Sequence, residues 1–277
     1  MRLAFAKMHG LGNDFVVFDR LDAPPWRPTS AQCAALAHRR RGVGCDQLVL
    51  LEPCSGVTAR MVIINADGSE AEMCGNAARC VGWYLRHRRG LPGPRYTLAT
   101  GAGVVGLELL DGDRVAVDMG TPVLQGTQIP TTWEGMVVNH PLAVAETTVH
   151  LTAVSMGNPH AVLFDAAVER FPLERVGPEL ERDPHFPRRV NVEVVQVLAP
   201  DRLRMRVWER GAGITEACGT GACAAAVAAV LNGYCQRRVV VALDGGELDI
   251  HWRQEDGRVI MTGAAAMVFQ GEVDIED

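Results

Sequence analysis

Cys74 and Cys218 each stand in a short stretch that could do acid–base chemistry. The stretches are MCGNAAR (residues 73–79) and ACGTGAC (residues 217–223). In both, the cysteine and a glycine precede an alanine-rich apolar run, a pattern that predicts a helix. A cysteine at a helix N-terminus lies at the positive end of the helix dipole, which favours the thiolate. The free N–H groups of the first helical turn can hold an anion such as a carboxylate.

Two such cysteines facing each other would suit the movement of a proton at a stereocentre. One thiolate removes the proton from the carbon beside a carboxylate, and the opposite thiol returns a proton on the other face. The helix dipoles and N–H groups would stabilise the charge that develops on the carboxylate. This chemistry needs no cofactor and no metal. A pyridoxal mechanism lacks a good candidate for its Schiff base, because Lys7 is the only lysine and lies in a predicted strand.

The segments around the two cysteines indicate an internal duplication. Cys218 follows Cys74 by 144 residues, since 218 − 74 = 144, and the same offset carries Asn65 onto Glu209 and Gln47 onto Asn191. Near the start of each half the offset slips, so that GNDFVVFD (residues 12–19) matches GNPHAVLFD (residues 157–165). Each half reads as several strands and one long helix, predicted at about residues 75–89 in the first half.

A duplicated chain of this kind predicts an α+β fold with two pseudo-symmetric lobes. We expect an N-terminal lobe at residues 1–119 and a C-terminal lobe at residues 120–262. Residues 263–277 form a last strand that could return to the first lobe. The cleft between the lobes is then the expected active site, with one cysteine helix from each side.

Composition excludes several other classes of protein. The chain has 277 residues, a net charge of −6 and only short basic runs, so we expect no nucleic-acid partner. It shows no signal peptide and no apolar run long enough to span a bilayer, which predicts a soluble, cytoplasmic protein without a membrane partner. The 8 cysteines include no CxxC pair, so we expect neither a disulfide framework nor a structural zinc site. The cysteines other than the two above are expected to be packing residues.

At these residues the chain resembles the diaminopimelate epimerases over nearly its whole length. The resemblance rests on GLGNDF (10–15), GCDQ (44–47), NADGS (65–69) with CGN (74–76), GNPH (157–160), Asn191, and ERG (209–211) with ACGTG (217–221). It implies a pyridoxal-independent two-base enzyme that interconverts LL- and meso-2,6-diaminopimelate on the route to lysine and peptidoglycan. It also implies that each lobe is a β-barrel-like roll around a central helix, and that the protein is a homodimer.

The resemblance also implies roles for individual residues. Cys74 and Cys218 are the base and the acid, and His160 and Glu209 tune the two thiols. The remaining positions bind substrate: Gly75, Asn76, Gly219 and Thr220 at the reacting carboxylate; Asn13, Gln47 and Asn158 around the reacting end; and Asn65, Asn191, Glu209 and Arg210 at the distal amino acid. An arginine fork suits a carboxylate and a glutamate suits an ammonium group, which agrees with the last set.

Two alternative functions remain open from the sequence. Proline and hydroxyproline racemases resemble the chain in fold, but they place a histidine where Asn76 stands. A non-catalytic redox-thiol protein is a candidate from another class. It would have one reactive cysteine and no need for Glu209 and Arg210.

Overall fold

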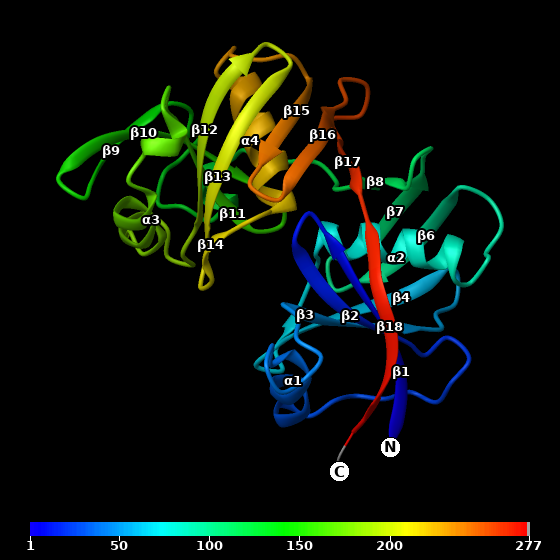
Figure 1. Cartoon of the computed structure of the whole chain (residues 1–277). Helices are drawn as coiled ribbons and strands as arrows, with labels where there is room; N and C mark the ends of the chain where they lie inside the picture. The colour runs from blue at the N-terminus through cyan, green and yellow to red at the C-terminus, as the bar shows by residue number, and fades with distance from the viewer. Residues whose placement is uncertain (276–277) are drawn as a thin grey trace. The chain divides into compact units, whose positions relative to one another are not determined.

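The computed structural model describes residues 1–275 and divides the chain into two compact units (Figure 1). Unit 1 is Met1–Asp118 together with Gly263–Asp277, and unit 2 is Met119–Thr262. No helix within residues 1–275 is long and apolar enough to cross a membrane. Each unit is a mixed structure of many strands and two α-helices, which confirms the predicted α+β class.

Unit 1 contains one long helix, one short helix and nine strands. Its elements in chain order are β1 (Arg2–Gly10), β2 (Asn13–Asp19), α1 (Ser30–Ala37), β3 (Gln47–Glu52), β4 (Ala59–Asn65), β5 (Glu70–Ala71), α2 (Gly75–His87), β6 (Arg95–Thr100), β7 (Gly103–Leu109), β8 (Arg114–Asp118) and β18 (Ala266–Asp274). The last strand, β18, pairs with β1 in an antiparallel register.

Unit 2 also consists of strands and two α-helices, and it has two 3₁₀ helices in addition. Its elements are the 3₁₀ helix η1 (Gly126–Gln128), β9 (His140–Val144), β10 (Thr147–Ser155), β11 (Pro159–Phe164), the 3₁₀ helix η2 (Val168–Arg170), α3 (Leu173–Glu181), β12 (Asn191–Ala199), β13 (Arg202–Glu209), β14 (Gly213–Thr215), α4 (Gly219–Leu231), β15 (Arg238–Leu243), β16 (Gly246–Trp252) and β17 (Val259–Ala264), whose end crosses the boundary.

The strand pairings of unit 2 repeat those of unit 1, as the offset of 144 residues predicts. Strands β2 and β3 are parallel, as are β11 and β12, and the next strand is antiparallel in both units. The register repeats as well, because Phe15 lies opposite Gln47 and His160 lies opposite Asn191. Corresponding sequence positions therefore occupy corresponding places in the two sheets.

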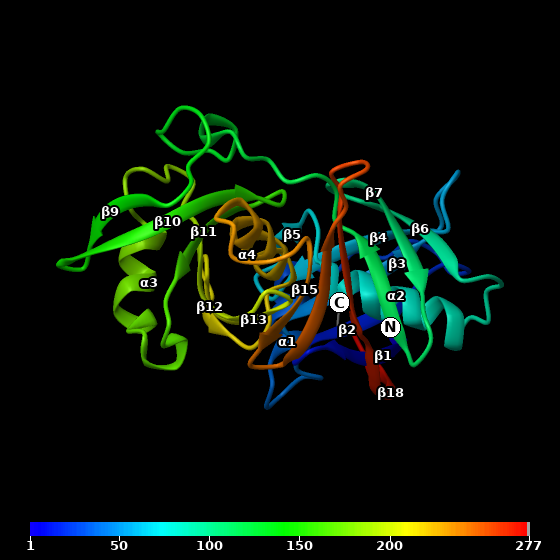
Figure 2. The same cartoon turned by 90° about the horizontal axis from the view of Figure 1, so that it is seen from above.

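The two cysteine helices are the central helices of their units. Helix α2 packs against β1, β7, β8 and β18, and α4 packs against strands β10 to β13 and β15 and β16 (Figures 1 and 2). Helix α4 is built almost entirely of alanine, glycine and valine and is buried nearly all round, as expected for a helix enclosed by a sheet. Cys80 and Cys223 lie inside these helices with no exposed surface, which confirms their predicted packing role.

The short helices differ most from the sequence prediction. Helix α1 begins after Thr29, whose hydroxyl accepts from the N–H of Gln32 in a capping box. It ends at Ala37, because His38 has an extended conformation with ψ 114°. Helix α3 was not predicted. Pro178 lies inside it, and a proline normally argues against a helix interior.

Candidate active site

In unit 1, three of the predicted site residues lie at one edge of the sheet. Strand β2 begins at Asn13 and the parallel strand β3 begins at Gln47, while the antiparallel strand β4 ends at Asn65. Gln47 and Asn65 are opposite each other, and Gln47 Nε2 donates to Asn65 Oδ1 at 2.8 Å. The strand directions alone bring these three amides to the same edge.

Cys74 stands at this edge as the N-cap of α2, directly before Gly75. Its thiol donates to Asn13 Oδ1 at 3.7 Å, and Asn76 Nδ2 donates to the same oxygen at 3.1 Å. Asn13 presents that oxygen because its Nδ2 donates to Asp46 Oδ2 at 2.8 Å. We call the six residues of this group the Cys74 cluster: Asn13, Gln47, Asn65, Cys74, Gly75 and Asn76.

An ionic network holds the Asn13 end of the Cys74 cluster. Lys7 Nζ donates to Asp14 at 2.6 Å, and Arg39 donates to both Asp14 and Asp46. Burial opposes ionisation of Asp14, but hydrogen bonds from Arg39 and Lys7 lower the pKa of its carboxyl group to about 2. Lys7 is buried in this ion pair, which agrees with its dismissal as a Schiff-base lysine.

Unit 2 places the matching residues at the matching edge. Asn158 directly precedes β11, Asn191 begins β12, and Glu209 ends β13. Asn191 accepts from the backbone N–H of Arg210 at 2.9 Å and donates to the carbonyl of Pro159 at 3.0 Å. Arg210 itself is exposed, and its Nη1 donates to the carbonyl of Arg188 at 2.9 Å.

Cys218 is the N-cap of α4 and is only 5% exposed. Its sulfur accepts from the N–H of Gly221 at 3.4 Å and lies 3.5 Å from Thr220 Oγ1. The carboxyl group of Glu209, which accepts a hydrogen bond from Thr215, is near enough for its charge to raise the pKa of the Cys218 thiol. We call this group the Cys218 cluster: Asn158, His160, Asn191, Glu209, Arg210, Cys218, Gly219 and Thr220.

At Cys218, burial raises the pKa of the thiol by more than the helix N-terminus lowers it. Desolvation, followed by the charges of Glu209 and Glu193, raises the pKa of the Cys218 thiol well above its usual value, although Thr220 and the N–H of Gly221 act in the opposite direction. Burial also raises the pKa of Glu209. The helix terminus was expected to favour a thiolate, but Cys218 rests as a thiol because a buried sulfur loses more hydration than one N–H bond and the dipole restore.

His160 lies in the Cys218 cluster but does not bond to its sulfur. The ring is fully buried, with Nδ1 2.7 Å from Glu193 Oε1 and Nε2 2.9 Å from Asn158 Oδ1. Glu193 is also fully buried and was missed by the sequence analysis. A signal was present, since Glu193 is the one acidic residue in the valine-rich stretch NVEVVQV, and glutamate is seldom buried unless it is paired.

Replacement of Glu209 with glutamine is expected to ease ionisation of Cys218. The negative charge of the Glu209 carboxylate raises the pKa of the thiol because it repels the thiolate. Removal of that charge therefore shifts the pH midpoint for alkylation of Cys218 to lower pH. The midpoint is measured with iodoacetamide and peptide mass spectrometry, with Glu216→Gln as the control. A midpoint that rises would contradict this electrostatic account.

Gly221 leaves no room for a side chain in the Cys218 cluster. A Cβ there would lie 2.7 Å from Glu193 Oε1 and 3.2 Å from Cys218 Sγ. We expect Gly221→Ala to lower the free energy of unfolding by about 1–3 kcal/mol, the usual cost of overpacking. The loss should be smaller in a Glu193→Val background, which removes the nearest atom. Urea denaturation of the wild type, the two single variants and the double variant measures the loss of unfolding free energy in each background. Equal losses in the two backgrounds would rule out the clash.

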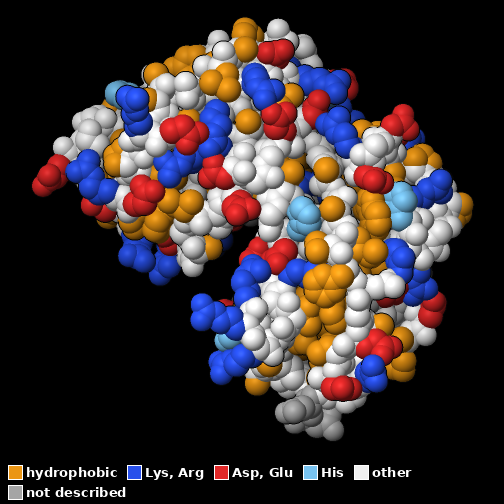
Figure 3. Space-filling model, viewed as in Figure 1, with side chains coloured by type: hydrophobic (Ala, Val, Ile, Leu, Met, Phe, Trp, Pro, Cys, Tyr) orange, Lys and Arg blue, Asp and Glu red, His pale blue; other side chains and the backbone are white. Residues whose placement is uncertain are grey.

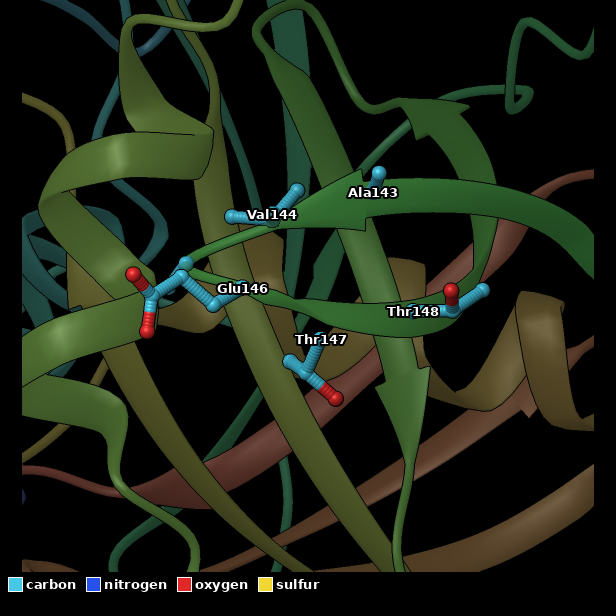
Figure 4. A pocket seen from close by; sticks show the side chains of 6 residues that line it. Ala143, Val144, Glu146, Thr147 and Thr148 are labelled. Atoms are coloured by element: carbon cyan, nitrogen blue, oxygen red, sulfur yellow. The ribbon is translucent and has the colours of Figure 1, made fainter.

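A hollow elsewhere in unit 2 offers much less chemistry. It surrounds the turn between β9 and β10 and is lined by residues 143–148 (Figure 4). Glu146 supplies its only ionisable side chain, and the remaining lining residues are alanine, valine and threonine. The two cysteine clusters, with their amides and carboxylates, are therefore the candidate active-site groups.

Comparison with known proteins decides the family. A sequence model of diaminopimelate epimerase matches residues 5–125 and 152–268. The chain is 53% identical over 271 residues to the diaminopimelate epimerase of Magnetococcus marinus, covering 97% of this chain and 96% of that protein. This chain belongs to the diaminopimelate epimerase family. It is also 46% identical to the diaminopimelate epimerase of Heliobacterium modesticaldum, over 98% of this chain and 99% of that protein.

The fold extends beyond this family. A hydroxyproline epimerase from Agrobacterium vitis superposes with a TM-score of 0.69 at 14% sequence identity, covering 100% of this chain and 93% of that one. Identity at that level establishes a shared fold only. The expected fold of two α+β lobes is thereby confirmed, and the diaminopimelate epimerase family is separated from the racemases that share it.

Proposed function

We propose that this protein interconverts LL- and meso-2,6-diaminopimelate by a two-base mechanism. The observation that carries the proposal is that Cys74 and Cys218 cap the central helices of two repeated units in a member of the diaminopimelate epimerase family. In each cluster the helix N-terminus can hold a carboxylate beside a sulfur. A mechanism of this kind uses no cofactor.

The proposed reaction moves one proton to a sulfur and one from a sulfur. The thiolate of one cysteine takes the α-proton, and the electron pair of the broken C–H bond delocalises into the carboxylate. The thiol of the other cysteine then protonates the opposite face, which inverts the carbon and leaves that sulfur as the thiolate. The N–H groups of Gly75, Asn76, Gly219 and Thr220 would stabilise the charge on the carboxylate. The roles of the two cysteines exchange with the direction of the reaction.

Residues of both clusters would recognise each end of the substrate. Asn13, Gln47 and Asn158 would contact the reacting end of the substrate. Asn65, Asn191, Glu209 and Arg210 would bind the unreacted amino acid. Glu209 has a second role, because its charge raises the pKa of the Cys218 thiol. His160 would act on the thiols through Asn158, its hydrogen-bond partner in unit 2.

Incorporation of solvent deuterium tests the proposed function. LL-diaminopimelate is incubated with the protein in D₂O, and NMR follows exchange at the α-carbons together with loss of optical purity. We expect deuterium at the inverted carbon and formation of the meso isomer. No exchange by the folded protein would contradict the proposal.

L-Proline is the control substrate, because it tests the racemase alternative directly. We expect no exchange into proline, since Asn76 stands where those racemases have a histidine and the chain shares only the fold with a hydroxyproline epimerase. Exchange into proline without exchange into diaminopimelate would favour the racemase. Alkylation of a single cysteine, with no exchange into either compound, would favour a redox-thiol protein.

We also propose that the protein is a cytoplasmic homodimer. Apolar side chains gather on the surface of unit 1 over β1 and β18 (Figure 3), and Val268 and Phe269 of β18 are 57% and 46% exposed. Exposed apolar side chains in a group are typical of an interface. Light scattering should give twice the chain mass for the wild type and the chain mass for Phe269→Glu. A monomeric wild type would disprove the dimer.

A further inference from the structure

His160 and Glu193 form a buried polar pair that has no counterpart in unit 1. Val162 lies opposite Glu193 in the β11–β12 register, and Val17 lies opposite Val49 in the β2–β3 register. The repeat therefore places Phe15 and Val49 in unit 1 where unit 2 has His160 and Glu193. All four residues are fully buried, with 0% exposed surface.

The fold itself does not require this polar pair. Phe15 and Val49 fill the same places in the sheet of unit 1 with apolar side chains. Removal of an imidazole and a carboxyl group from water is costly, and an apolar pair of similar volume is often at least as stable. Glu193 is held by His160, and its Oε2 finds no hydrogen-bond partner within residues 1–275. A role in the site explains the pair better than a role in folding.

A chain of hydrogen bonds connects this pair to Cys218 through Asn158 and Thr220. Asn158 uses its Nδ2 to donate to Thr220, so its Oδ1 faces His160 Nε2 at 2.9 Å, and an amide oxygen can only accept there. Nε2 is therefore the donor, and one further proton lies between Nδ1 and Glu193 Oε1, which are 2.7 Å apart. Asn158 Nδ2 then donates to Thr220 Oγ1 at 3.3 Å. Thr220 has one hydroxyl proton and already accepts from Asn158, so that proton is available for Cys218 Sγ at 3.5 Å.

We infer that Glu193 is a positioning residue, which acts through His160, Asn158 and Thr220 to supply a hydrogen-bond donor to Cys218. Glu193 and His160 Nδ1 hold one proton between them, so Nε2 keeps its own proton, and this fixes the orientation of the Asn158 amide. The amide in turn leaves Thr220 as a donor. A donor at the sulfur stabilises the thiolate, which the buried site otherwise disfavours. The inference rests on the proposed function for its purpose, but it is tested on the sulfur alone.

Two ionisable groups besides Glu193 face Cys218 or its partners. The charge of Glu209 on β13 raises the pKa of the Cys218 thiol, and His160 on β11 belongs to the hydrogen-bond chain. Glu193 on β12 therefore has two opposite effects on the sulfur. Its charge repels a thiolate, whereas its hydrogen bond to His160 favours one. The sign of the change on mutation distinguishes these effects.

Glu193→Leu and Glu193→Gln separate the hydrogen-bond chain from the charge. Glutamine can donate to His160 Nδ1, which keeps the proton on Nε2, whereas leucine leaves Nδ1 without a partner and fixes neither tautomer. We expect the midpoint for alkylation of Cys218 in the unliganded protein to rise by about one pH unit in Glu193→Leu, because a hydrogen bond to a charged group is lost. The midpoint of Glu193→Gln should stay at the wild-type value or fall. A fall in both variants would mean that Glu193 acts only through its charge and would overturn the inference.

A double-mutant cycle between Glu193 and Thr220 tests the chain itself. Thr220→Val should raise the midpoint by a similar amount, and Thr220→Ser, which keeps the hydroxyl, should not. Because Glu193 would act through Thr220, the Glu193→Leu/Thr220→Val protein should match the single variants. Additive shifts would show that the two residues act separately and would overturn the inference.

A second variant covers the case in which Glu193→Leu does not fold. His160→Phe/Glu193→Val copies the apolar pair of unit 1, and we expect it to fold with the same rise in the Cys218 midpoint. A folded protein with an unchanged midpoint would overturn the inference. Alkylation needs no substrate, so failure here is distinct from failure of the deuterium exchange that tests the proposed function.

Discussion

Alanine at either Cys74 or Cys218 is expected to lower kcat for LL-diaminopimelate by at least about 10³-fold, because positioned acid–base groups each contribute about 10²–10⁴-fold. Epimerisation needs a proton removed from one face and another delivered to the opposite face. Neither alanine variant can do both. Water can replace a missing acid only poorly at a residue as buried as Cys218, which is 5% exposed.

The matched control is Cys54→Ala, which removes an exposed thiol beyond the end of β3 that lies opposite to Gln47. It should keep the wild-type kcat, measured by circular dichroism of the product mixture. Circular dichroism in the far ultraviolet should confirm that all three variants are folded. If one of the two cysteine variants retained more than about a tenth of the wild-type kcat, the two-base mechanism would be wrong, since that loss is below the range for a positioned acid or base.

Isotope exchange makes the same experiment more specific. Each single variant keeps one sulfur and can still remove a proton from one face. We expect the remaining cysteine to exchange solvent deuterium into only one of the two substrate isomers, without inversion. The two variants should differ in which isomer exchanges, because their remaining sulfurs would approach from opposite faces. Exchange into the same isomer by both would contradict this arrangement.

The sequence predicted the elements that carry the cysteines well. Gly75 and Gly219 after the cysteines, with alanine-rich runs behind them, mark the starts of α2 and α4, and both helices begin at those glycines. The offset of 144 residues also aligned Gln47 with Asn191, which begin equivalent strands. These features are local or repeated, so a single sequence contains them.

The network behind the cysteines was not predictable in the same way. Glu193 and His160 are 33 residues apart, and only the parallel register of β11 and β12 brings them together. The repeat gave no help, because unit 1 has an apolar pair there. The raised pKa of Cys218 could not be predicted from the sequence either, because it depends on how completely the thiol is buried and on the charge of the nearby Glu209. The helix terminus does lower the pKa of this thiol, as expected, but burial and the nearby carboxylates raise it by more.

Replacement of Arg210 is expected to have the second large effect, on kcat/KM rather than on the fold. Arg210 follows Glu209 at the end of β13, with its backbone N–H bonded to Asn191 and one guanidinium nitrogen bonded to the carbonyl of Arg188. These bonds hold an exposed guanidinium at the edge that carries the rest of the Cys218 cluster. Its remaining donors can form a two-point fork with the distal carboxylate of the substrate.

Arg210→Lys keeps the charge but loses the fork. Because each hydrogen bond to a charged group contributes about 1.5–3 kcal/mol, we expect kcat/KM for diaminopimelate to fall about 10²-fold or more, and further in Arg210→Ala. Arg188→Ala is the matched control, since it removes a neighbouring positive charge but leaves the carbonyl that orients Arg210. Steady-state kinetics of the three variants measure the effect.

The pattern of the losses identifies what Arg210 recognises. If Arg210 binds the distal carboxylate, its loss should not change the alkylation midpoint of Cys218, and a diaminopimelate monoamide that lacks the distal charge should be affected little by the mutation. A long-range electrostatic role would instead give similar losses in Arg210→Ala and Arg188→Ala, weakened by salt in both. Lysine at position 210 has the same charge as arginine but lacks the second aligned donor. A large loss in Arg210→Lys would therefore mean that the geometry of the fork, and not the charge alone, selects the substrate.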